Sequence, residues 1–206
     1  MGYTTYFNGQ FDVTPTLTDA HREYLEAFSN TRRMRRNPDL LPPDPIREAA
    51  GLPAGDEGAY FVGGGGYAGQ DRDASVLDYN EPPGIPSMPH DPDMSTFSQR
   101  FNDYQRRKAE AVKNGAQPGL WCHWVPNDEG TAIVWDEGEK FYEYVKWIEY
   151  LIKHFLAPWG YKLNGEVRWV GEDSSDRGII LAVDNVVKVG IAKDVYTFAD
   201  GSTKED

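Results

Sequence analysis

Residues 137–169, EGEKFYEYVKWIEYLIKHFLAPWGYKLNGEVRW, contain two different periodicities and so indicate the class of fold. The first part repeats large apolar residues at helical spacing, and Pro158 and Gly160 end that repeat. From Tyr161 to Trp169 apolar and polar residues alternate, which is typical of a strand with one buried face. We therefore predict a helix over 137–160 that leads directly into a strand. The helical apolar positions are Phe141, Tyr144, Val145, Ile148, Leu151, Ile152 and Phe155.

The residues on either side of this stretch add further strands. A dipeptide typical of tight hairpins, Asp184-Asn185, separates the last two of them. The polar residues 200–206 are expected to form a disordered tail. The predicted strands are 120–125, 131–135, 179–183 and 186–192.

The N-terminal part predicts one strand and one helix. Residues 3–13 alternate with a period of two, which predicts a strand. Thr18 is a good helix N-cap, and the basic run 32–36 would lie at the C-terminal end of that helix, where cations favour the helix dipole. Asn37-Pro38 would then end the helix.

The middle of the chain, about 38–119, is rich in Pro and Gly and only weakly periodic. It predicts an irregular insertion. A structureless segment of this length is unusual inside a compact domain, so we expect it to be partly ordered over the surface or partly mobile. One helix is expected within it, over 95–114, with Ser95 as N-cap and a mostly solvated surface.

The element order predicts an α+β fold in which two main helices cover one face of an antiparallel sheet. The first six regular elements match the βαββαβ order of ferredoxin-like folds, and a C-terminal hairpin would extend the sheet. Another α+β topology stays open, because element order alone does not fix strand pairing. We predict one domain over 1–199, with the insertion at about 38–119.

Composition disfavours two classes of partner. The chain of 206 residues has a formal net charge of −12, so general nucleic-acid binding and anionic membranes are both disfavoured. No apolar run reaches the length of about 18 residues that a membrane helix needs. The N-terminus also lacks the basic and apolar segments of a signal peptide. We expect a cytoplasmic protein. A local basic patch could still bind an anion despite the negative net charge.

The polar residues predict neither a metal nor a cofactor nor a catalytic set. Cys122 is the one cysteine, which excludes an intramolecular disulfide and a cysteine-based zinc site. His21, His90 and His154 have no spacing that indicates a shared metal. Asp71 and Asp73 alternate as in calcium loops, but the other ligands of such a loop are missing.

The stretch FVGGGGYAGQDRD, residues 61–73, is the first candidate binding site. Its glycines leave backbone N–H groups free to approach an anion, yet the sequence lacks the Lys and Ser or Thr of a phosphate-binding loop. A structural turn is therefore favoured over a ligand cradle. The candidate residues here are Gly64, Gly65, Gln70, Asp71 and Arg72.

The basic run and one tryptophan complete the candidate set. Guanidinium groups suit phosphates and carboxylates, although a helix end paired with acidic residues explains the run more simply. Trp121 and Trp124 lie on opposite faces of their predicted strand, so one of them could face the insertion and line a pocket or partner surface. The basic candidates are Arg32, Arg33, Arg35 and Arg36.

Several motifs together resemble a family of uncharacterised proteins found in bacteria and tailed bacteriophages. The resemblance runs from residue 1 to about residue 189. It implies no activity and no catalytic residues, and it favours an accessory protein of a phage or mobile element. The motifs are MGYTT, TRRMRR, YFVGG followed by GQDRD, and GEKFYEYVKWIEYLIKHFLAPWGYKLNGEV.

These observations predict a non-catalytic binding protein that recognises a host protein or an anionic small ligand. A phage origin would allow a counter-defence role, including capture of a nucleotide signal. One alternative is a hydrolase or transferase acting on a nucleotide through Asp71, Asp73 or Glu166 and an arginine. The other is a structural or assembly protein, whose oligomeric state the sequence leaves open.

Overall fold

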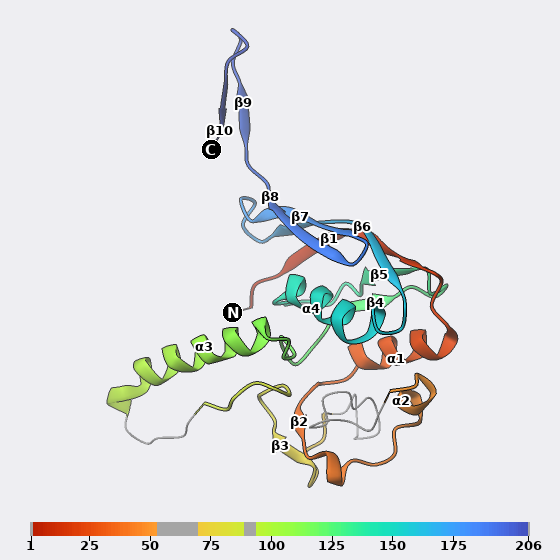
Figure 1. Ribbon diagram of the computed structural model, residues 1–206. Helices are drawn as coiled ribbons and strands as arrows, with labels where there is room; N and C mark the ends of the chain where they lie inside the picture. The colour runs from red at the N-terminus through yellow and green to blue at the C-terminus, as the bar shows by residue number, and fades with distance from the viewer. Residues whose placement is uncertain (1, 53–69, 89–93, 206) are drawn as a thin grey trace.

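The computed structural model describes residues 2–52, 70–88 and 94–205, without the side chains of Tyr196 and Glu205. It has an α+β architecture built on a six-stranded antiparallel sheet with the order β4-β5-β1-β6-β7-β8 (Figure 1). The predicted α+β class is therefore confirmed. The sheet strands are β1 (Thr5–Thr14), β4 (Trp124–Pro126), β5 (Ala132–Trp135), β6 (Lys162–Gly171), β7 (Arg177–Val183) and β8 (Val186–Ile191).

The two longest strands, β1 and β6, pair at the centre of the sheet along their whole length. The register runs from Thr5 opposite Gly171 to Thr14 opposite Lys162. Alternate residues of both strands are buried, as the period of two predicts. The hairpin predicted at Asp184-Asn185 is confirmed, because Val183 pairs with Val186 across it.

Two helices lie on the same side of this sheet and form the core with it (Figure 1). These are α1 (Asp19–Ser29) and α4 (Tyr144–Leu151), and α4 continues as a π-helical turn over Ile152–Leu156. Aromatic rings join the layers. Phe7 of β1 lies 4.9 Å from Tyr144 of α4 between ring centroids, and burial of such rings supplies much of the hydrophobic stabilisation.

Two predicted helix boundaries are wrong. The first helix ends at Ser29, and the basic run that was expected to extend it turns away to form β2 (Arg35–Arg36), which pairs with β3 (Val76–Asp78). The second helix begins at Tyr144, because the residues before it include Glu137, Lys140 and Glu143 with positive φ, which no α-helix permits. Likewise, β4 begins at Trp124, and residues 120–123 precede it as an irregular segment.

The insertion contains more regular structure than its composition predicts. It includes the short helix α2 (Pro45–Ala49) and β3, which pairs with β2 just before the insertion. The predicted helix in its second half is present as α3 (Phe97–Lys113), which follows Thr96 rather than Ser95 and buries only Tyr104 among its residues. Among the described residues, none of the helices is both long and apolar enough to cross a membrane.

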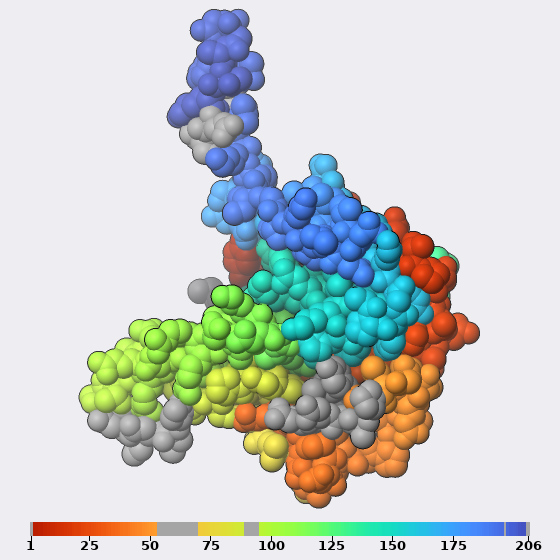
Figure 2. Space-filling model, viewed as in Figure 1, coloured from red at the N-terminus to blue at the C-terminus, as the bar shows by residue number. Residues whose placement is uncertain are grey.

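The C-terminal residues also differ from the prediction of a disordered tail. Strand β10 (Thr203–Glu205) pairs with β9 (Val195–Thr197) in a second small hairpin. This hairpin projects away from the sheet and forms a narrow arm on the molecular surface (Figure 2).

Candidate functional site

The arginines of the basic run bind the insertion, and Arg36 makes the densest set of contacts. Its side chain is 1 % exposed. Its guanidinium donates to the Asp73 carboxylate at 3.0 Å, to the Ser75 hydroxyl at 2.8 Å and to the Asp71 carbonyl at 3.4 Å. Two candidate residues far apart in the sequence, Arg36 just before the insertion and Asp71 within it, are thus in contact.

Arg32 and Arg35 also hold this segment. Arg32 and Arg72 both place their guanidinium groups over the ring of Tyr79, at 4.3 and 3.9 Å from its centroid. Arg35 donates to the Ile85 carbonyl at 3.0 Å and pairs with Asp78 at 3.2 Å. These cations therefore already have protein partners at the places where an anionic ligand would bind.

Arg33 is enclosed by the core. It is 2 % exposed, stacks over Phe28 at 4.5 Å, and its burial lowers the pKa of its guanidinium below the usual value. Its carbonyl accepts a hydrogen bond from Gln117 at 3.1 Å, and its N–H donates to the Leu120 carbonyl at 2.9 Å. Of the remaining candidates, Gln70 is half-buried, and Gly64 and Gly65 lie outside the described residues.

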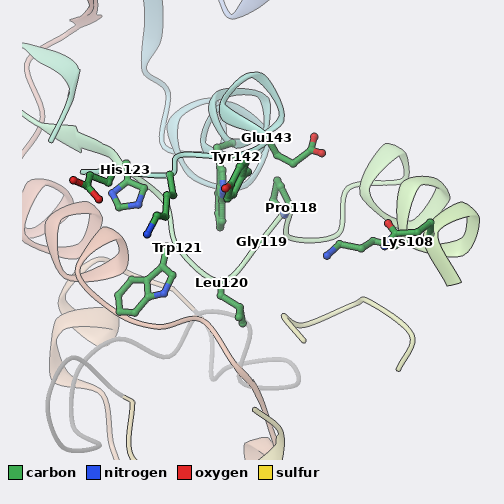
Figure 3. A pocket seen from close by; sticks show the side chains of 12 residues that line it. Lys108, Pro118, Gly119, Leu120, Trp121, His123, Tyr142 and Glu143 are labelled. Atoms are coloured by element: carbon green, nitrogen blue, oxygen red, sulfur yellow. The ribbon is translucent and has the colours of Figure 1, made fainter. Parts of the chain in front are cut away.

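The last candidate, Trp121, lies on the wall of a cleft between α3, the segment 118–123 and the loop before α4 (Figure 3). The cleft has a volume of about 770 Å³, which is in the range of small-molecule sites. We call it the α3–α4 cleft. It is lined by Gln105, Lys108, Pro118, Gly119, Leu120, Trp121, His123, Glu139, Lys140, Tyr142, Glu143 and Trp147.

The end of α3 is fixed against the π-helical turn that follows α4, and these contacts hold the two sides of the cleft together. Lys153 donates to the Asn114 carbonyl at 3.2 Å, and the Nε2 atom of His154 lies 2.9 Å from the Gly115 carbonyl. Gly115 has φ +103°, a conformation in which glycine is unstrained and which lets the chain turn from α3 toward the cleft.

The loop that forms the opposite wall stores backbone strain. Glu137, Lys140 and Glu143 have φ values of 64°, 61° and 56°, in the left-handed region that non-glycine residues rarely adopt. Each such residue costs about 1–3 kcal/mol, and such residues cluster at binding sites. Two of them, Lys140 and Glu143, line the cleft.

The cleft combines aromatic walls with cations. Trp121, Tyr142 and Trp147 supply the rings, and Lys108 extends from α3 with its ammonium group directed toward the segment of Pro118 and Gly119 (Figure 3). Within residues 2–52, 70–88 and 94–205, neither Lys108 nor Lys140 forms an ion pair. These lysines therefore remain available to an anionic group.

A histidine and a carboxylate meet at the same cleft. The Nδ1 atom of His123 lies 2.9 Å from one carboxylate oxygen of Asp136, and Asp136 also accepts from the Gly138 N–H at 2.7 Å. This contact orients the ring and leaves Nε2 as its second polar atom. Burial raises the pKa of the neighbouring Cys122 thiol to about 12, so the thiol stays protonated and unreactive at neutral pH.

A second cavity of about 430 Å³ continues the cleft along α3. It shares Lys108 and Glu143 with the first and adds Lys113 and Lys146. Among the described residues, no group of three or more potential metal ligands comes together.

We expect the protein to lose stability in acid at the buried His154, because burying a charged ring outweighs its hydrogen bond to the Gly115 carbonyl. Burial lowers the pKa of His154 below its usual value, and the neighbouring Lys153 acts in the same direction. The unfolded chain therefore binds the proton more tightly, and this contribution to stability is lost as pH falls below about 6.5, the unfolded value.

In urea titrations at pH 7 and pH 5, the wild type should lose more stability than His154→Phe, which keeps a ring stacked on Tyr150. An equal loss in both proteins would contradict this assignment. Some dependence should persist in the variant, because burial also lowers the pKa of His21.

Comparisons with protein-family models, with curated proteins and with solved structures found no match to this chain. Sequence reasoning identified Trp121, but it missed Lys108, Lys140, Tyr142 and the His123–Asp136 contact. Their positions depend on how α3 packs against α4, which no local pattern encodes.

Proposed function

We propose that this protein is a non-catalytic binding protein whose α3–α4 cleft takes a small ligand with a flat apolar body and an anionic group. The observation that carries the proposal is one cavity in which aromatic walls and two lysines without ion pairs among the described residues occur together. Stacking on Trp121 and Tyr142 would bind the flat body, and Lys108 and Lys140 would bind the anion.

The placement of the other candidate residues supports this choice of site. The arginines of the basic run bond to carboxylates and carbonyls of the insertion, so an anion there would have to displace them. The cleft needs no such displacement. A nucleotide combines a flat base with phosphate groups and fits this chemistry. A phage origin and capture of a host nucleotide signal remain part of the proposal.

The test is a thermal-shift panel of nucleoside mono- and diphosphates, followed by calorimetry on any compound that stabilises the protein. We expect Lys108→Glu to weaken binding by about tenfold or more, since it replaces attraction with repulsion at the anion. Arg106→Glu is the matched control, because Arg106 lies on the same helix and is 79 % exposed. No stabilisation by any compound, or equal losses in both variants, would remove the proposal.

The second candidate function is catalysis, and it rests on the His123–Asp136 contact at the cleft. The ring of His123 is oriented as a general base requires. The carboxylates expected from the sequence do not support an enzyme here, because Asp73 pairs with Arg36 and Glu166 pairs with Arg168 at 2.9 Å. If a bound nucleotide is converted to product, His123→Gln should abolish turnover and leave binding within about twofold.

We also propose that the sheet contains two interleaved split β-α-β units of the ferredoxin-like type. Neighbouring strands are antiparallel, so β1 and β4 run parallel with β5 between them. By the same reasoning, β5 and β6 run parallel with β1 between them. This order supports the proposal.

A further inference from the structure

The free edge of β8 is a feature that the proposed function leaves unused. Strand β8 ends the sheet, and its second edge has no partner among the described strands. The other edge strand, β4, is only three residues long, whereas β8 has six. Exposed edges of this length are usually covered or blocked, because their unpaired N–H and C=O groups pair readily with another strand.

The side chains of β8 are unusually apolar for an exposed edge. Val186 is 58 % exposed, Val189 is 49 % exposed and Ile191 is 78 % exposed. Lys188 is the one charged residue of the strand. Water contact with this surface is unfavourable, at roughly 25 cal/mol per Å² of apolar area.

The hydrogen-bond pattern shows which residues face outward. Ala192 donates to the Arg177 carbonyl at 2.9 Å, so the even-numbered residues of β8 bond to β7. The backbone groups of Val187, Val189 and Ile191 therefore point away from the sheet, because bonding alternates along an antiparallel strand. The side chains of these three residues lie on the face that carries Ile180 and Ala182 of the core.

We propose that this edge binds a second copy of the chain, with β8 pairing antiparallel to β8 across a twofold axis. A twofold axis perpendicular to the sheet keeps the helices of both copies on the same side of the joined sheet. Odd-numbered residues of one β8 strand then lie opposite odd-numbered residues of the other, and even-numbered residues lie opposite even-numbered ones. With Val189 opposite its own copy, Val187 lies opposite Ile191 and each Lys188 lies opposite Gly190. Centring the pair on Lys188 would place two like charges directly opposite, which is destabilising.

The β9–β10 arm is a second observation that favours a second copy. Its two strands, β9 and β10, pair with each other, and the hairpin projects from the sheet (Figures 1 and 2). A single two-stranded hairpin is marginally stable in water. Val195 and Phe198 on it are 56 % and 52 % exposed. In the pairing centred on Val189, each arm extends past the β7–β8 turn of the other copy, where these side chains can be covered.

The test is sedimentation velocity of the full chain over a concentration series. We expect a dimer that Val189→Lys weakens by about tenfold or more, because two lysines would then lie opposite each other at the axis. Val170→Lys is the matched control. Val170 is 46 % exposed on β6, away from the edge, and its substitution should leave the dimer intact. A monomeric wild type, or a Val189→Lys protein that still dimerises, would overturn the proposal.

A cysteine variant tests the register and guards against misfolding of the lysine variant. Opposite residues in a hydrogen-bonded pair have Cα atoms about 5.5 Å apart, within reach of a disulfide. Val189→Cys should therefore cross-link two chains under oxidising conditions, whereas Val186→Cys should not. The native Cys122 is buried and stays out of the reaction. Absence of the Val189→Cys cross-link would also overturn the proposal.

Discussion

Replacing Arg36 by methionine should lower the free energy of unfolding by about 2–4 kcal/mol. The guanidinium is buried and bonds to the Asp73 carboxylate and the Ser75 hydroxyl. Methionine keeps most of the apolar stem but leaves these groups without their donor. Asp73 is partly exposed, so water can solvate its carboxylate once the guanidinium is gone. We therefore expect a smaller loss of unfolding free energy than for an ion pair in which both partners are buried.

Urea denaturation measures the loss, and limited proteolysis shows where it acts. Cleavage should begin in residues 70–88, which the arginines hold to the core. Arg106→Met provides the control, since its exposed pair with Asp103 should contribute less than about 1 kcal/mol.

The same variant distinguishes two roles for the basic run. If Arg36→Met keeps wild-type stability but loses binding of an anion, the run is a ligand site, as the sequence allowed. If stability falls and the remaining folded protein still binds, the arginines are structural and the site lies in the cleft. The contacts of Arg36 favour the second result.

The sequence predicted the elements better than their ends. Alternation in residues 3–13 and 161–169 identified the central strands, because one face of each is buried against the helices. The helix start at Tyr144 could not be predicted, since residues 137–143 continue the amphipathic pattern but include three left-handed residues. The basic run likewise appeared helical because its partners, Asp73 and Asp78, lie far along the chain.

Of the residues that line the proposed site, the sequence singled out only Trp121. The predicted strand over 120–125 put Trp121 and Trp124 on opposite faces. The structure places Trp124 of β4 in the core and Trp121 in the cleft, although Trp121 lies in the irregular segment before that strand. Lys108 and Lys140 gave no signal, because a lysine on a solvated helix or loop is ordinary. They become a candidate site only when α3 packs beside α4.

This pair of tryptophans gives the second large prediction. Trp124 is 1 % exposed, its ring lies between 5.3 and 5.5 Å from those of Phe7, Phe11 and Phe141, and its Nε1–H donates to the Tyr144 carbonyl at 2.8 Å. Trp124→Ala should therefore cost about 3–5 kcal/mol of unfolding free energy. Trp124→Phe should cost about 1–2 kcal/mol, because it keeps a ring but loses the hydrogen bond to the start of α4.

Trp121→Ala, the same substitution only three residues away, should have the opposite profile. The Trp121 side chain is half-exposed on the wall of the cleft, so its loss should change stability by less than about 1 kcal/mol. Binding in the cleft should weaken by about tenfold or more, since stacking on this ring would be lost. Urea titration and calorimetry on both variants separate the two effects. A Trp121→Ala protein that binds as well as the wild type would place the ligand elsewhere, whatever Trp124→Ala does to stability.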